Sequence, residues 1–351
     1  MRTLLTACGL AAALMGSAAT SAALAADAPY KVLRTVKTGG EGGFDYVYAD
    51  AANRKLYAPR SGAGSARVSV FDLDTLAPIK EFSGIAARGV TVDAKSGHGF
   101  SSSKPVAMWD AKTLASIKTI EIQGNPDGIL GDASNQRVYI LSHAEPNVTV
   151  INAADGSVAG TIDLGGMPEQ AVSDGKGHLY IDLEDKNRVA VVDAKTLTKT
   201  GEYDPKCSAP AGLAFDVANH LLFVGCRNPA VMAIMNSDTG VILATLPIGT
   251  GVDGAVFNPA TKEAFSSQGD GTLTVIKELS PTSFAVEQTV QTQVSAKTLT
   301  LDRKTNRILL IAAEFGPVPP TPAPVPGAPP VRPPNRGPML PGSFATLEVG
   351  R

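Results

Sequence analysis

The feature of this sequence that most constrains its fold is an internal repeat of about forty residues. Each repeat contains a short apolar segment that ends in Asp or Asn and a polar turn, as in ARGVTVDAKSG and PAGLAFDVANH. Neighbouring turn residues are 39 to 44 positions apart, and they are Asp50, Asp93, Asp132, Asp174, Asp216, Asn258 and Asp302. Apolar segments such as VSVFDLDT and VAVVDAKT follow about twenty residues later. A chain with this pattern folds as an array of equivalent units.

Each repeat has room for four short β-strands, with Asx and Gly in the tight turns between them. A four-stranded antiparallel unit of this length is the blade of a β-propeller, whereas solenoid repeats of this length are normally helical. Seven inner segments therefore predict an all-β, seven-bladed propeller in residues 30–351. The last repeat lacks an outer strand, and the N-terminal YKVLRTVKTG can supply it. We expect the N-terminal and C-terminal strands to pair and close the ring.

The N-terminus has the pattern of a secretory signal. Arg2 precedes an apolar run rich in Ala and Leu, and Ala23-Leu24-Ala25 offers a small-x-small cleavage site. We expect residues 1–25 to be removed and the mature protein to be periplasmic or secreted, with no transmembrane span. An uncleaved membrane anchor is the alternative. Cys8 falls in the removed part, and we expect Cys207 and Cys226 to form a disulfide in the oxidising compartment.

Residues 316–342 interrupt the last repeat. Twelve prolines lie between Pro317 and Pro341, and such a segment cannot form a strand ladder. We expect a loop insertion between the second and third strands of blade seven, because surface loops accommodate added length at small cost.

Composition disfavours one class of partner. The formal net charge is −2 and aromatic residues make up 5% of the chain, so there is no basic surface with interleaved aromatics. Nucleic-acid binding is therefore disfavoured, and we expect a monomer that binds a small polar ligand or a peptide or protein segment.

Several stretches carry a family resemblance, among them GGMPEQAVSDGKGHLYIDLEDK, GLAFDVANHLLFVGCRN, GTGVDGAVFNPAT and SSQGDGTLTV. From about Tyr30 to Arg351 the chain resembles the YncE-like, YVTN-repeat propellers of exported bacterial proteins. This resemblance implies a seven-bladed propeller and a periplasmic location. Propellers of broadly similar fold include lactone hydrolases and the haem or copper propellers of nitrogen-oxide reductases, but fold alone does not transfer chemistry.

One position of the repeat is unusually charged. Five residues before the turn, the seven repeats read Asp45, Arg88, Asp127, Glu169, Ala211, Asp253 and Lys297. Because the innermost strand of a blade begins at the central channel, we expect these side chains to surround one mouth of the channel. The second strands end on the same face, with Arg60, His143, Glu184, Arg227, Gln268 and Glu314.

These residues allow three interpretations. Ion pairs among them could simply lock the blades together. A binding or scaffold propeller could hold a small polar ligand, a cation or a partner segment there, through Asp45, Arg88, Asp127, Glu169, Asp253, Lys297, Arg60, His143, Arg227 and Glu314. A metal-assisted hydrolase of the lactonase kind could hold a divalent cation such as calcium on Asp45, Asp127, Glu169 and Asp253.

The enzyme interpretation is the weaker of the last two. No general base is identifiable, so catalytic residues stay unknown, and Arg88 and Lys297 would oppose a bound cation. Three of the four histidines fall in turns of the opposite face, which argues against a His-rich copper site, and no C-x-x-C-H motif for covalent haem is present.

Overall fold

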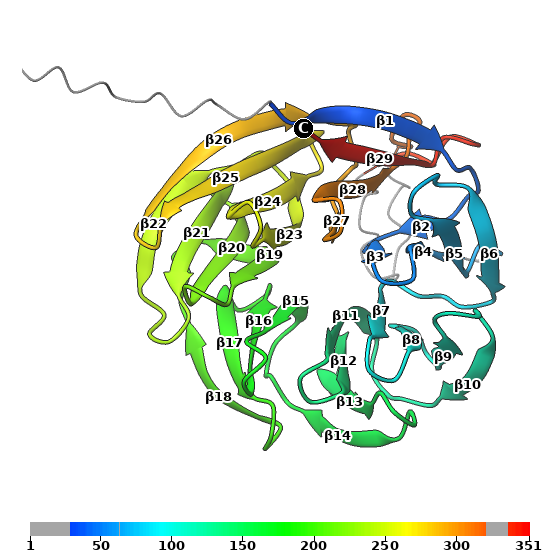
Figure 1. Cartoon of the computed structure of the whole chain (residues 1–351), viewed down its shortest axis with the longest axis horizontal. Helices are drawn as coiled ribbons and strands as arrows, with labels where there is room; N and C mark the ends of the chain where they lie inside the picture. The colour runs from blue at the N-terminus through cyan, green and yellow to red at the C-terminus, as the bar shows by residue number, and fades with distance from the viewer. Residues whose placement is uncertain (1–28, 63, 321–335) are drawn as a thin grey trace, which may run out of the picture.

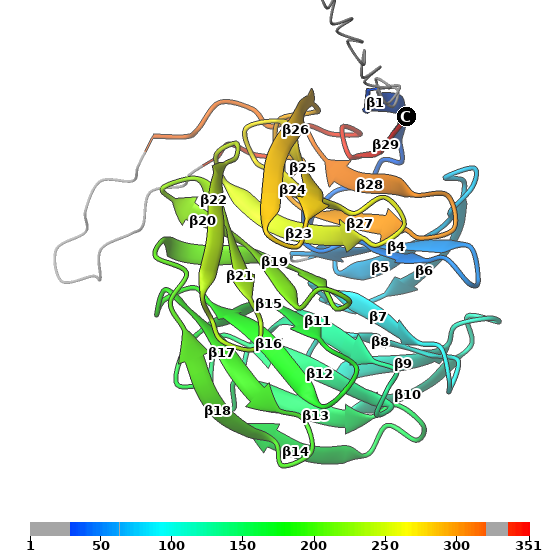
Figure 2. The ribbon, with the colours of Figure 1, turned by 60° about the vertical axis from the view of Figure 1, so that its left-hand side comes forward.

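The computed structural model describes residues 29–62, 64–320 and 336–351. In these residues the chain forms seven antiparallel sheets arranged as a ring and no helix, so the predicted seven-bladed propeller is confirmed (Figure 1). Seen obliquely, the sheets follow one another as separate layers around the ring (Figure 2). The expected signal peptide at 1–25 and residues 321–335 of the Pro-rich insertion lie outside the described residues.

Each blade runs outward from the ring axis in four positions. The innermost strands are β2 (Gly43–Phe44) with β3 (Tyr48–Asp50), β7 (Val90–Asp93), β11 (Pro126–Asp132), β15 (Pro168–Ser173), β19 (Ser208–Asp216), β23 (Val252–Asn258) and β27 (Leu299–Asp302). The second strands are β4 (Lys55–Ser61), β8 (His98–Ser101), β12 (Arg137–Ser142), β16 (His178–Leu183), β20 (Leu221–Asn228), β24 (Glu263–Gln268) and β28 (Arg307–Ala312).

The third strands are β5 (Arg67–Asp72), β9 (Val106–Asp110), β13 (Val148–Asn152), β17 (Arg188–Asp193), β21 (Val231–Asn236), β25 (Thr272–Ser280) and β29 (Ala345–Gly350). The outermost strands are β6 (Pro78–Ser83), β10 (Ser116–Ile120), β14 (Val158–Ile162), β18 (Thr198–Tyr203), β22 (Ile242–Pro247), β26 (Ser283–Gln291) and β1 (Lys31–Lys37). We call the face where the chain enters the innermost strands the entry face, and the opposite face, with the Asx turns that follow these strands, the turn face.

The two ends of the chain close the ring. Strand β1 lies beside β29, antiparallel, with Lys31 opposite Gly350 and Lys37 opposite Ala345 (Figure 1, blue and red). The hydroxyl of Tyr30 donates a hydrogen bond of 2.6 Å to the carboxylate of Glu263 in blade six. The predicted closure is therefore confirmed, and it removes the free edge that blade seven would otherwise expose.

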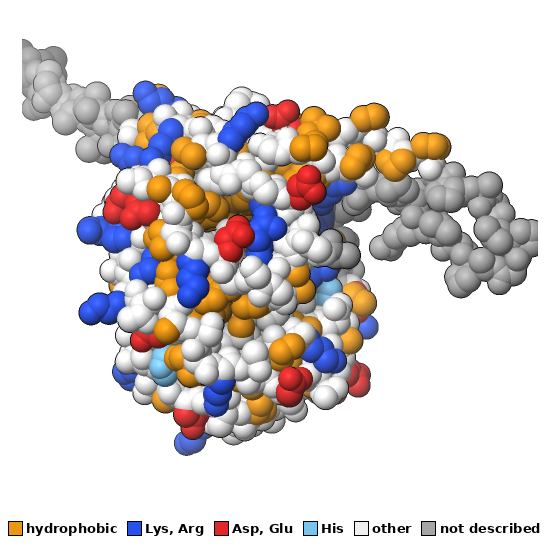
Figure 3. Space-filling view, turned by 90° about the vertical axis from the view of Figure 1, so that its right-hand side faces the viewer, with side chains coloured by type: hydrophobic (Ala, Val, Ile, Leu, Met, Phe, Trp, Pro, Cys, Tyr) orange, Lys and Arg blue, Asp and Glu red, His pale blue; other side chains and the backbone are white. Residues whose placement is uncertain are grey.

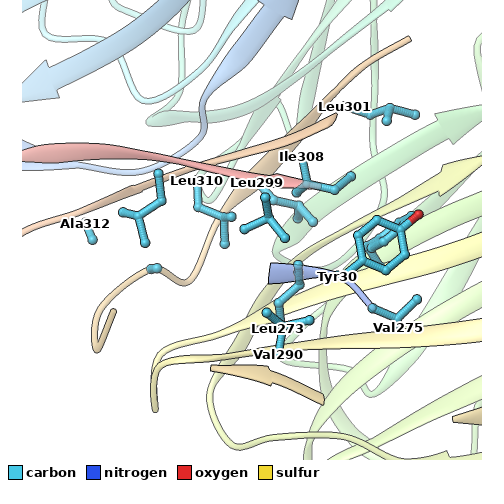
Figure 4. Close-up of a cluster of buried hydrophobic side chains, with 13 residues drawn as sticks. Tyr30, Leu273, Val275, Val290, Leu299, Leu301, Ile308, Leu310 and Ala312 are labelled. Atoms are coloured by element: carbon cyan, nitrogen blue, oxygen red, sulfur yellow. The ribbon is translucent and has the colours of Figure 1, made fainter. Parts of the chain in front are cut away.

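The hydrophobic core is divided among the interfaces between neighbouring blades. At one of these, Leu273 and Val275 of β25 face Ile308 and Leu310 of β28, and Tyr30 belongs to the same buried cluster (Figure 4). Alternate residues of each strand point to the two faces of its sheet, so every sheet buries apolar side chains against both neighbours.

Acidic side chains fix the recurring turns. Asp110, at the end of a third strand, accepts hydrogen bonds from the backbone amides of Lys112 and Thr113, at 3.0 and 2.6 Å. Asp132, at the end of an innermost strand, accepts one from Ser134 at 2.9 Å. This local bonding is the reason Asp recurs at fixed positions of the repeat.

Two further sequence features can be placed in the ring. Cys207 and Cys226 form the predicted disulfide within blade five, with their Cα atoms 6.0 Å apart. The described ends of the Pro-rich insertion pair with each other, since the amide of Gly316 donates to Pro338 and the amide of Leu340 donates to Glu314, both at 2.8 Å.

The surface carries no single-sign patch on the side shown in Figure 3, where basic and acidic side chains are interspersed. None of the described residues forms a helix that could cross a membrane.

Candidate functional site

Eight charged side chains on the entry face form a closed ring of alternating sign. In order they are Asp45, Arg88, Asp127, His143, Glu169, Arg227, Asp253 and Lys297. Each carboxylate contacts a cationic side chain on either side. We call these eight residues the charged ring.

The contacts on one half of the charged ring involve Arg88 and His143. The guanidinium of Arg88 lies 3.1 Å from the Asp45 carboxylate and 3.4 Å from that of Asp127. Nε2 of His143 lies 2.9 Å from Asp127 and 3.3 Å from Glu169. One imidazole nitrogen therefore faces two carboxylates.

Arg227 and Lys297 complete the other half. Arg227 lies 3.9 Å from Glu169 and bonds Asp253 and Glu184. Lys297 bonds Asp253 and lies 3.2 Å from Asp45, which closes the circle.

The sequence repeat predicted six of these eight residues at a single aligned position. The seventh aligned residue, Ala211, leaves a gap in blade five, and Arg227 at the end of β20 fills it from the second strand. His143, which follows β12, adds a cation between the carboxylates of blades three and four. The acidic excess expected at this position is therefore balanced by side chains from the second strands.

Irregular strand pairing directs the ring residues inward. The register of β11 against β12 shifts between Pro126 and Ile129, around Asp127, and β15 and β23 shift at their equivalent positions. A bulge of this kind re-aims one side chain. Gly128 follows Asp127 because a Cβ there would lie 2.5 Å from the carbonyl oxygen of Glu169.

The innermost segment of blade one is broken where a single strand was expected. Strands β2 and β3 both pair with β4, but the intervening residues bond sideways instead. The amide of Tyr46 donates to the carbonyl of Arg88 in blade two at 3.0 Å.

The cations of the charged ring are more exposed than its carboxylates. Side-chain exposure is 47% for Arg88, 31% for Arg227, 26% for His143 and 22% for Lys297. It is 13% for Asp45, 8% for Glu169 and 5% for Asp127 and Asp253. A molecule that approaches this face meets mainly hydrogen-bond donors.

Mutual contact shifts the titration of the ring residues. Hydrogen bonds to Asp127 and Glu169 raise the pKa of His143 to about 10, so its imidazole is a cation at neutral pH. Burial raises the pKa of Glu169 to about 7, although His143 opposes this. Burial also raises the pKa of Asp45, against the attraction of Lys297. For Lys297, burial alone lowers the pKa, but Asp253 and Asp45 outweigh it and the net shift is upward.

Tyr46 crosses the ring axis beside these charges. It belongs to blade one, and its hydroxyl donates to the backbone carbonyl of Glu169 in blade four at 3.1 Å. Burial raises the pKa of this phenol well above its usual value, and the carboxylates of the charged ring, Glu169 foremost, add to the effect. The repeat pattern did not single out this residue; the signal available was an aromatic side chain directly after a ring position.

Gln170, the neighbour of Glu169, joins three blades. Its side-chain oxygen accepts hydrogen bonds from the amides of Leu213 and Ala255, at 2.9 and 3.0 Å, and its nitrogen donates to the carbonyl of Ala255 at 2.9 Å. The side chain of Tyr46 thus connects blade one to blade four, and that of Gln170 connects blade four to blades five and six.

Two of the ten residues expected to bind a ligand lie outside the charged ring. Arg60 is 1% exposed, and its guanidinium donates to the carbonyls of Gly40 and Gly42 and covers the ring of Phe344 at 3.6 Å. Glu314 is exposed and lies 3.6 Å from Lys37. Both residues have contacts that support loops of blades one and seven.

One part of the charged ring has the composition of a metal site. Asp127, His143 and Glu169 offer ligand atoms that all lie within 4.8 Å of one another. The four carboxylates expected to bind calcium do not form one ligand group. Asp127 and Glu169 belong to this cluster, whereas Asp45 and Asp253 both bond Lys297. A nitrogen and two carboxylates suit zinc or manganese better than calcium, which prefers oxygen ligands throughout.

Comparisons with known proteins support the fold but identify no family. No protein-family model matches the sequence, and no curated protein matches it either. Among solved structures, 1591 chains match, so the fold is too widespread to indicate an activity. One is a chain from the crystal structure of the mitotic checkpoint complex, with a TM-score of 0.68, 13% identity, and coverage of 88% of this chain and 96% of that one. At this identity the likeness shows the seven-bladed propeller fold and nothing further.

Proposed function

We propose that this protein is a binding propeller whose charged ring holds a small polar ligand rich in acceptor oxygens, such as a carboxylate. The observation that carries the proposal is the difference in exposure within the ring. The carboxylates are buried and hold the cations in place, while Arg88, His143, Arg227 and Lys297 present donors to the surface. Donors fixed in advance bind an oxyanion at a low cost in conformational entropy.

Malonate is a suitable probe because its two carboxylates can contact two cations of the ring. We expect saturable binding by isothermal titration calorimetry, and Arg88→Gln should weaken it about fivefold. The matched control is Lys186→Gln, an exposed cation in the loop after β16 on the same face. Equal affinities in both variants, or heat no larger than that of sodium chloride at the same ionic strength, would contradict the proposal.

Export to an oxidising compartment is part of this proposal. The disulfide between Cys207 and Cys226 supports it, because structural disulfides are rare in reducing compartments. N-terminal sequencing of protein secreted by its host should give a first residue at or within two positions of Ala26; a start at Met1 would count against export.

The second candidate function is metal-assisted hydrolysis, which the Asp127, His143 and Glu169 cluster favours. A bound Zn²⁺ would supply a Lewis acid there. The expected result is one zinc per chain by calorimetry, lost in Asp127→Asn and retained in Asp45→Asn, with δ-valerolactone hydrolysis removed by a chelator. Zinc binding without hydrolysis would show that the cluster is a metal site and would contradict the lactonase function.

A further inference from the structure

A cavity of about 970 Å³ lies on the ring axis and opens on the turn face. Residues of all seven innermost strands, or of the turns that follow them, line it. None of the eight residues of the charged ring does so. Gln170 lines the cavity, whereas Glu169, one position closer to the entry face, belongs to the charged ring. The cavity is therefore a compartment distinct from the site described above.

Apolar side chains form most of the cavity wall. Five that line it while remaining only half-buried are Val92, Leu130, Val172, Phe215 and Val256. A ligand that covers solvent-exposed apolar groups in a concave site removes them from water, which favours binding. A cavity of this size, with apolar walls and a few polar groups, is typical of small-molecule sites.

The cations and the carboxylates at the cavity rim differ in their hydrogen bonding to the rest of the chain. Arg303 and Lys112 line the cavity, are exposed, and have side chains with no hydrogen bond or ion pair to any described residue. Asp50 and Asp132 also line it, but both are buried and accept hydrogen bonds within their own turns.

Asp110 accepts the amide and the hydroxyl of Thr113 in the same way. The acceptors at the rim are therefore engaged in turns, while the two cations are free to bind.

We propose that the turn-face cavity binds an anionic amphiphile, a carboxylate attached to an apolar chain or ring. The apolar part lies against the wall formed by Leu130, Val172 and Val256, and the carboxylate pairs with Arg303 and Lys112 at the rim. Gln170 limits how far the apolar part can enter, because its amide is bonded on both sides to blades five and six.

Decanoate is the probe, measured by calorimetry below its critical micelle concentration. We expect one site per chain, with octanoate about tenfold weaker because two methylene groups fewer are buried. Arg303→Glu should weaken decanoate about fivefold, and Lys304→Glu, the adjacent exposed residue that does not line the cavity, less than twofold. Arg88→Gln, in the charged ring, should leave decanoate binding unchanged, which separates this site from the proposed carboxylate site.

Three results would overturn the proposal. They are the absence of saturable decanoate binding, equal losses in Arg303→Glu and Lys304→Glu, and binding of decyltrimethylammonium as tight as that of decanoate. The last would mean that the apolar wall binds without any contribution from the rim cations.

Discussion

The two ends of the ring axis lie on opposite faces of the same propeller and differ in chemistry. At the entry face, eight charged side chains are paired in a closed circle. At the turn face, about three residues further along each strand, half-buried apolar side chains surround a cavity of about 970 Å³. The repeat thus positions equivalent residues around an axis, and the residue type at each level decides what that level can bind.

The two ends also differ in whether their side chains are already paired with other residues of the chain. In the charged ring every charge has partners of opposite sign, so removal of one charge takes one of two partners within the ring from each of its neighbours. In the cavity the half-buried apolar side chains pack against the cores between the blades and leave part of their surface open to the cavity, so substitution of that surface should affect ligand binding.

The largest effect is expected at Asp253, which bonds both Arg227 and Lys297 and is 5% exposed. Asp253→Asn should lower the free energy of unfolding by about 3 kcal/mol, because two cations lose their shared carboxylate. Guanidinium denaturation would measure this. Glu314→Gln, at an exposed carboxylate outside the charged ring, should change stability by less than about 0.5 kcal/mol. If the two variants were equally stable, the charged ring would not hold the blades together.

A smaller loss is expected from the residue that separates the two ends. Gln170→Leu removes three hydrogen bonds and leaves the amides of Leu213 and Ala255 without their acceptor. We expect a loss of about 2 kcal/mol in denaturant unfolding. Gln123→Leu, at an exposed position before β11, provides the control. A Gln170 variant as stable as its control would mean that water replaces these bonds.

The pH dependence of stability should reveal the cation between two carboxylates. The pKa of His143 is raised from 6.5 to about 10 in the folded protein. Its stabilising contribution is therefore complete below pH 6.5 and is lost as the pH rises through 10, by at most about 1.4 kcal/mol per pH unit.

In metal-free protein, thermal unfolding should show this decline between pH 7 and 10 in the parent chain. It should be absent in the double variant His143→Gln/Glu169→Gln, which also lacks the neighbouring carboxylate whose pKa is raised to about 7. Parallel pH profiles for the two proteins would show that His143 is not held as a cation.

The sequence predicted the architecture well because each repeat contains the strands and turns of one blade. Asp and Gly turns at regular spacing identified the blades, and the missing outer strand of blade seven identified β1 as its replacement. The disulfide followed from two remaining cysteines.

Most residues of the candidate site were predictable, but their pairing was not. Alignment of repeats identified six of the eight ring residues, because they occupy equivalent positions at the start of the innermost segments: Asp45, Arg88, Asp127, Glu169, Asp253 and Lys297. It could not show that His143 and Arg227 insert between them, since both come from the ends of second strands, where no spacing rule fixes the direction of a long side chain. The cavity was missed for a related reason: half-buried apolar residues in a strand have the same sequence pattern as fully buried ones.

The central claim, that opposite charges alternate in a closed ring, can be tested most directly at His143. Its imidazole should be followed by NMR as the pH is raised, with the resonance assigned by its disappearance in His143→Gln. The structure predicts that the imidazole stays protonated through neutral pH and titrates at about 10, because Asp127 and Glu169 both bond Nε2. Titration near 6.5, the ordinary value for histidine, would show that the imidazole does not lie between two carboxylates and would contradict the account.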